Sequence, residues 1–239
     1  MPYYYGIDWT YIVLVLPCIL LSLWASSNVN TTFRKYSRQY ASRNITAAEA
    51  AQRVLRANGV TGVRIDRVAG NLTDHFDPKT NVIRLSDSVY SSTSTAAIGV
   101  ACHEAGHAVQ YAQSYAPIKL RAAIIPITNF GSRIAMPLIL LGILCTFLGE
   151  FSTLLVYLGI AAFGMSLVFQ IVTLPVEFNA SRRAMEAIAS AGILTEDEQR
   201  GARKTLTAAA LTYVAATAVA LAQLIRLIAI FGRTRRRND

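Results

Sequence analysis

The sequence predicts a mostly α-helical integral membrane protein with a small soluble part that carries a short β-sheet. Of its 239 residues, 53% are hydrophobic and only 15% are charged, and the mean hydropathy is +0.37. About four apolar segments are long enough to cross or enter a bilayer, which takes a helix of about 20 residues. This composition disfavours an ordinary soluble domain.

The first apolar segment covers residues 9–25 and predicts a membrane anchor within residues 1–33. Pro17 interrupts the segment, but a membrane helix tolerates proline where its surroundings satisfy the freed carbonyl group. A cleaved signal peptide begins with a positive region, and residues 1–8 contain no Lys or Arg. We therefore expect the anchor to be retained. The aromatic residues that suit a membrane interface are Tyr3, Tyr4, Tyr5 and Trp9.

Residues 34–133 are expected to form the soluble part. Thr46 and Glu49 have the spacing of a capping box, which opens a helix that Asn58 and Gly59 end. Short strands are expected within residues 60–68 and 72–85, with a turn at residues 74–81. Hydroxyl side chains at residues 91–95 can cap a second helix, which meets no proline before Pro117.

Residues 134–175 are expected to form a membrane hairpin. Its two spans cover residues 134–148 and 151–174, and Glu150 is the only charged residue from 134 to 176. Gly149 and Glu150 mark the turn. A helical region at residues 176–205 follows.

The C-terminal part, residues 206–239, combines an apolar segment with a basic tail. The apolar segment covers residues 206–231 and is interrupted by Arg226. Its many alanines would allow close packing against other helices.

The motif His103-Glu104-Ala105-Gly106-His107 lies in the second predicted helix. At about 100° per residue the two histidines share one helix face, one turn apart. Neutral imidazoles bind zinc well, and a catalytic zinc keeps one position for water beside three protein ligands. Glu104 could take a proton from that water. The pattern predicts one Zn²⁺ per chain; the competing interpretation is two surface histidines with an incidental glutamate.

Two residues compete for the third ligand position. Glu177 follows Pro175 at the expected start of a helix, where an acidic side chain also suits the helix dipole without binding a metal. His75 is the remaining histidine of the three in the chain. It belongs to the turn, or it hydrogen-bonds a substrate or developing oxyanion; Glu177 is the better ligand candidate.

Several segments together resemble a known family. They are residues 72–78, 83–86, 89–90, 97–101, the histidine motif, residues 174–184 and the region of residues 208–211. These segments resemble the bacterial neutral zinc metallopeptidases of the YugP type, and the resemblance spans nearly the whole chain. It implies a membrane-embedded peptidase with a gluzincin-like zinc core.

The segment around Glu177 is similar to the third-ligand helix of the HtpX and Ste24 membrane proteases. In those families a glutamate completes the zinc site and an acidic residue four positions later supports it. Ser181 occupies that later position here, and its hydroxyl can hydrogen-bond without supplying charge. The resemblance also implies that residues 82–86 form an edge strand on which an extended substrate pairs. Positions with a substrate or supporting role are His75, Ser181, Asn179 and Arg84.

Basic residues near the ends of the predicted spans indicate the orientation. By the positive-inside rule they place the soluble part, and hence the active site, on the cytoplasmic side of a multi-pass cell-membrane protein. The basic tail disagrees with this rule if residues 206–231 cross fully, so crossing, re-entry and an interfacial position all stay open. The net charge of +9 fits contact with anionic lipid, and nucleic-acid binding is not expected. The basic residues concerned are Arg34, Lys35, Arg38, Arg43, Arg133, Arg182 and Arg183.

Together these patterns predict a membrane-embedded zinc endopeptidase that hydrolyses peptide bonds of membrane or membrane-proximal proteins. His103, His107 and Glu177 would bind zinc, and Glu104 would act as general base. Peptide substrate and lipid bilayer are the expected partners. The alternative is an inactive, peptidase-like membrane scaffold or binding protein with a structural zinc.

Overall fold

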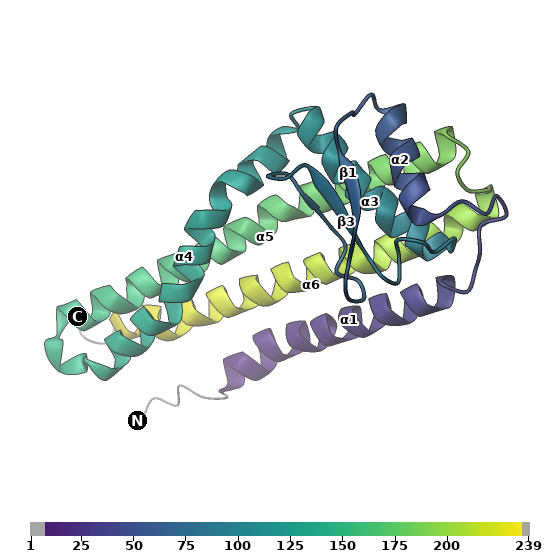
Figure 1. Ribbon diagram of the computed structural model, residues 1–239. Coiled ribbons are helices and arrows are strands. Elements are labelled where there is room, and N and C mark those ends of the chain that lie inside the picture. Colours follow the sequence, from purple (N-terminus) through teal and green to yellow (C-terminus); the bar gives the residue numbers. More distant parts are fainter. Residues whose placement is uncertain (1–7, 236–239) are drawn as a thin grey trace. The chain divides into compact units, whose positions relative to one another are not determined.

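The computed structural model describes residues 8–235, and its long helices and small sheet are shown in Figure 1. The chain forms two compact units. One consists of residues 1–24, 120–173 and 213–239, and the other of residues 25–119 and 174–212. The interfacial aromatic residues expected at positions 3–5 lie outside the described residues.

Long helices dominate residues 8–235, and each of them has residues in both units. They are a π-helical segment at Tyr11–Val15 that continues as α1 (Leu16–Tyr36), then α4 (Ala116–Leu144), α5 (Glu150–Ser190) and α6 (Glu196–Arg235). Within residues 8–235, four helices are long and apolar enough to cross a membrane. The predicted class, a mostly α-helical membrane protein, is therefore confirmed.

The hairpin turn lies where the sequence predicts it. A short 3-10 segment, Thr146–Leu148, follows α4, and Gly149 has a φ of +58° before α5 begins at Glu150. A glycine accepts this left-handed conformation without steric cost. The two arms then approach closely, because a Cβ atom at Gly159 would lie 2.8 Å from the carbonyl oxygen of Ala135.

The expected helix start after Pro175 is wrong. Pro175 and Glu177 both lie inside α5, which is continuous from Glu150 to Ser190. A proline in a helix interior removes one backbone hydrogen bond, but a helix of 41 residues retains the bonds on either side. Glu177 is thus not at a helix N-terminus, and the helix dipole does not explain its presence.

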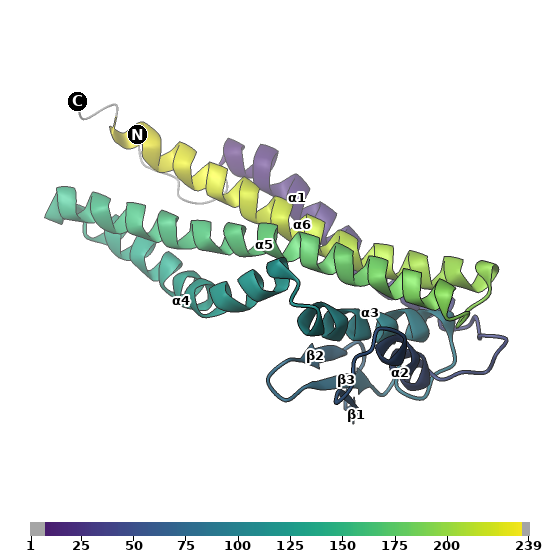
Figure 2. The same ribbon diagram turned by 90° about the horizontal axis from the view of Figure 1, so that it is seen from above.

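The second unit has α2 (Ala47–Ala57) and α3 (Thr95–Ala112) at its centre. The capping box of Thr46 and Glu49 is present, and α2 ends before Asn58, which is its C-cap residue, as expected. Ser94 caps α3 by accepting a hydrogen bond from the backbone N–H of Ala97. Figure 2 shows α2 and the sheet beside α3.

Three short strands form the sheet: β1 (Arg64–Val68), β2 (His75–Asp77) and β3 (Val82–Ser86). Their order is β1-β3-β2, with β1 parallel and β2 antiparallel to β3. The edge strand expected at residues 82–86 is therefore wrong, because β3 pairs on both sides. Its apolar residues Val82, Ile83 and Leu85 are fully buried, as suits a central strand.

Two glycines let α3 pack tightly in this unit. A Cβ atom at Gly106 would lie 2.7 Å from the carbonyl oxygen of Ala180 on α5. One at Gly99 would lie 3.2 Å from the Cα of Ala202 on α6. The close approach at Gly106 holds the motif helix against α5 near Glu177, and the approach at Gly99 holds it against α6.

Candidate metal centre

Three predicted ligands converge in the second unit. His103 and His107 on α3 and Glu177 on α5 have donor atoms that all lie within 4.8 Å of one another. The Nε2 atoms of His103 and His107 lie 3.2 and 3.6 Å from Oε2 of Glu177. The two imidazoles therefore present the same nitrogen to one carboxylate.

Helix geometry and close packing produce this convergence. The histidines stand one turn apart on α3, and their rings meet edge to face with centroids 4.7 Å apart. Gly106 lies between them and allows α5 to approach. Glu177 is 2% exposed, and a carboxylate at such a depth needs a charged or hydrogen-bonding partner.

Each of the two histidines also uses its outer ring nitrogen. Nδ1 of His103 lies 3.0 Å from Oγ of Ser181, and Nδ1 of His107 lies 3.0 Å from Oε1 of Gln110. Such contacts orient imidazole ligands and leave Nε2 free for a metal. A supporting role for Ser181 was expected from the sequence, whereas the role of Gln110 was not. Gln110 stands three residues after His107, and this helical spacing is the signal that could have found it.

Glu104 lies in the same helix and is nearly buried, at 9% exposure. Its negative charge acts on two neighbours. Burial raises the pKa of Asp74 and the charge of Glu104 raises it further, although hydrogen bonds from Ser86 oppose the shift. Burial lowers the pKa of His107, but its hydrogen bond to Glu177 and the nearby carboxylates outweigh burial, so the net shift is upward.

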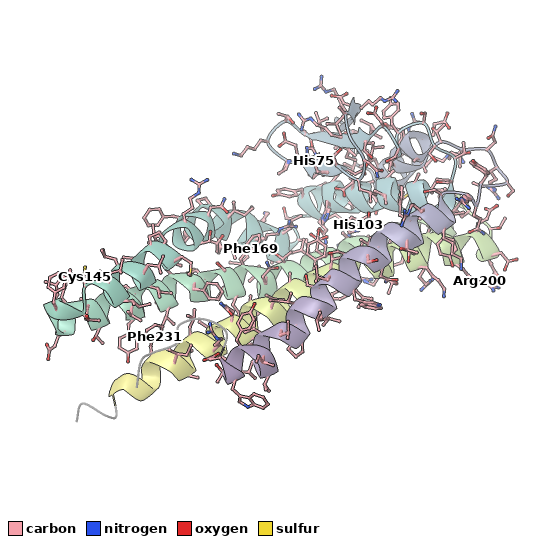
Figure 3. The ribbon with its side chains drawn as sticks, turned by 90° about the horizontal axis from the view of Figure 1, so that it is seen from below. His75, His103, Cys145, Phe169, Arg200 and Phe231 are labelled. Carbon is pink, nitrogen blue, oxygen red and sulfur yellow. The ribbon has the colours of Figure 1, made fainter. Side chains whose placement is uncertain are left out.

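His75 is not part of the ligand cluster. It lies on β2, exposed to solvent, with Nδ1 2.8 Å from the carbonyl oxygen of Thr73 (Figure 3). The turn predicted around it begins later than expected, since β2 already includes His75. Among the described residues, the cluster contains His103, His107 and Glu177, so the geometry favours Glu177 as third ligand.

The two other sequence candidates make structural contacts. Arg84 reaches back from β3, with Nη1 donating to Asp77 at 3.0 Å and Nη2 donating to Thr80 at 3.3 Å. Hydrogen bonds from Thr80 and Arg84 hold the pKa of Asp77 well below its usual range. Asn179 accepts hydrogen bonds from Gln110 at 2.9 Å and from Arg183 at 2.7 Å.

The donor set suits zinc. Two imidazole nitrogens and one carboxylate oxygen are zinc donors of the kind found in hydrolytic sites, where three protein ligands leave one position open. Ser181 and Gln110 supply the outer hydrogen bonds that such ligands require. The site and the four apolar helices thus define a membrane-associated protein with a candidate zinc centre.

Comparison with known proteins agrees with this class. Residues 11–232 match the family described as "Putative neutral zinc metallopeptidase", and the chain belongs to this family. It is 46% identical over 228 residues to "Putative membrane protease YugP" of Bacillus subtilis (strain 168), covering 95% of this chain and 99% of that protein. No solved structure matches the chain.

Proposed function

We propose that the protein is a membrane-embedded, zinc-dependent endopeptidase with a gluzincin-like site. The observation that carries this proposal is the convergence of His103, His107 and Glu177 around one point, with Glu104 nearly buried on the same helix as the histidines. Membership of a zinc metallopeptidase family supports it. Its substrates would be peptide bonds of membrane or membrane-proximal proteins.

The four residues of the proposed site have two roles, zinc binding and proton transfer. His103 and His107, through Nε2, and Glu177, through its carboxylate, would hold one zinc per chain. Zinc bound there would polarise the scissile carbonyl and make a water molecule more acidic. Glu104 takes the proton from that water as it attacks the carbonyl carbon, and then gives it to the departing amine.

The distribution of basic residues supports a cytoplasmic active site. Both stretches of the second unit, residues 25–119 and 174–212, carry Lys and Arg close to the proposed span ends. In a multi-pass protein with spans at α1, α4, α5 and α6, these stretches belong to one side. The positive-inside rule makes that side cytoplasmic.

Replacement of Glu104 by Gln tests the proposal. The variant keeps the size of the side chain but loses the base, so hydrolysis of an unfolded test protein should fall by about 10²–10⁴-fold. Zinc content measured on the same preparation should stay unchanged. Glu186→Gln is the control, because Glu186 is exposed and pairs with Arg182 rather than with the cluster.

Two results would count against the proposed function. Equal, chelator-resistant cleavage by wild type and Glu104→Gln would show that the activity does not come from this site. Zinc-loaded protein that cleaves nothing across a broad panel of peptides and membrane-protein fragments would instead favour the scaffold with a structural zinc.

A further inference from the structure

Gln110 is fully buried beside the candidate metal centre, and its side-chain amide is engaged on both ends. Its Oε1 lies 3.0 Å from Nδ1 of His107. Its Nε2 lies 2.9 Å from the carbonyl oxygen of Val176 and 2.9 Å from Oδ1 of Asn179. One amide group therefore joins a ligand on α3 to the residues that flank Glu177 on α5.

The partners on α5 fix which way this amide faces. The carbonyl oxygen of Val176 can only accept a hydrogen bond, so the group of Gln110 that meets it must be the NH₂. A flipped amide would place two oxygens against each other in a buried site, where an unsatisfied polar contact costs about 1–3 kcal/mol. The oxygen of Gln110 therefore faces His107.

Asn179 reinforces this orientation, and Arg183 in turn fixes Asn179. Nε of Arg183 donates to Oδ1 of Asn179 at 2.7 Å, and a guanidinium can only donate. The same oxygen faces Gln110, so it accepts there too. Arg183 is itself held, because it donates to Oε1 of Gln113 and lies over the ring of Tyr115, 5.8 Å from its centroid.

The direction of donation is therefore fixed, because His107 donates to Gln110 and Gln110 donates to Asn179. Since Oε1 of Gln110 accepts, Nδ1 of His107 carries a hydrogen, and Nε2 is the nitrogen whose lone pair can bind a metal. We propose that Gln110, held by Asn179 and Arg183, is a positioning residue that fixes His107 in the tautomer able to bind zinc through Nε2. The zinc-binding half of this inference rests on the proposed function.

The outer ring nitrogen of His103 has no comparable constraint. Its Nδ1 meets the hydroxyl of Ser181, which can either donate or accept. The partner of Nδ1 is thus fixed as an acceptor for His107 but not for His103. The two ligands differ in this respect although their spacing and ring geometry look alike.

Nitrogen NMR of the metal-free protein tests the assignment directly. The chain has three histidines, so ¹⁵N-histidine labelling gives few signals, and single replacements of His75, His103 and His107 assign them. Long-range ¹H–¹⁵N spectra in detergent should show His107 with hydrogen on Nδ1. Gln110→Met should convert His107 to a mixture and weaken zinc binding by about 10–100-fold.

Matched variants separate positioning from simple packing. Gln199→Met also removes a glutamine amide, but this amide donates to the carbonyl oxygen of Leu194 and does not contact the network around His107, so tautomer and zinc affinity should stay unchanged. Asn179→Asp keeps an acceptor oxygen for Gln110 and Arg183 and should preserve the tautomer. Asn179→Leu removes that oxygen, so the tautomer of His107 should be less strictly fixed. The two Asn179 variants therefore test the proposal even if Gln110→Met fails to fold.

The proposal is overturned if wild-type His107 carries no hydrogen on Nδ1, or if Asn179→Asp and Asn179→Leu both keep the Nδ1 hydrogen as firmly as wild type. Neither readout needs metal or peptidase activity. If the protein shows no peptidase activity but His107 carries hydrogen on Nδ1 as predicted, the proposed function is wrong and the role of Gln110 still stands.

Discussion

His103, His107 and Glu177 come together through two different kinds of information in the sequence. The spacing of the histidines sets one helix face, which follows from helical geometry alone. Glu177 lies 70 positions or more away along the chain and reaches the histidines because α5 packs against Gly106. Local periodicity contains no such long-range contact, so Glu177 could be proposed only from its surroundings and from resemblance.

Loss of the third ligand should be visible in metal content. Glu177→Ala leaves two imidazoles where three protein ligands are needed, so zinc retention after dialysis should fall well below one per chain. Elemental analysis of purified protein measures this, with Glu186→Ala as the exposed control on the same helix. If Glu177→Ala keeps its zinc while His75→Ala is empty, the ligand role passes to His75.

At the scale of elements, the sequence predicts which helices and strands exist better than it predicts where they end and which strands pair. The caps at Thr46 and Ser94 are local signals, and both are present. The position of β3 in the sheet depends on two other strands, and the edge position that the family resemblance implied for residues 82–86 is wrong. The helix start expected after Pro175 is also wrong, because the neighbouring turns keep α5 continuous through this proline.

The close approach of α3 and α5 makes a prediction about Gly106. A methyl group in Gly106→Ala would lie 2.7 Å from the carbonyl oxygen of Ala180, so the helices must separate. We expect a loss of about 1–3 kcal/mol in stability and weaker zinc retention. Gly164→Ala is the control, because its nearest contact is 4.0 Å away. Thermal unfolding in detergent compares them; equal melting temperatures and zinc contents would contradict the packing argument.

At the scale of the whole molecule, one ion pair addresses the open question of the C-terminal segment. Within the first unit, Nε of Arg226 on α6 lies 3.2 Å from Oδ1 of Asp8, and its guanidinium lies over the ring of Tyr11, 5.3 Å from the centroid. The beginning of the first helical segment and the end of α6 therefore lie together. If the first segment crosses the bilayer, we infer that α6 crosses it in the opposite direction, so both ends belong to one side.

Cysteine labelling of intact cells tests this topology. In a background without Cys18, Cys102 and Cys145, a cysteine at Gly232 or Glu150 should react with an impermeant thiol reagent. A cysteine at Asn58 should react only after lysis. Protection at Gly232 with reaction at Glu150 would show that α6 does not cross, and reaction at Asn58 in intact cells would reverse the orientation.

If the proposed function is right, His103, His107 and Glu177 hold a zinc with an open coordination position, as hydrolysis requires. X-ray absorption at the zinc edge of the purified protein measures the ligands of this zinc. We expect two imidazoles and oxygen ligands at about 2.0–2.2 Å, with one oxygen signal lost in Glu177→Ala and the wild-type spectrum kept in Glu104→Gln. A sulfur ligand at about 2.3 Å, or a third imidazole, would contradict the assigned ligand set and indicate a different zinc site.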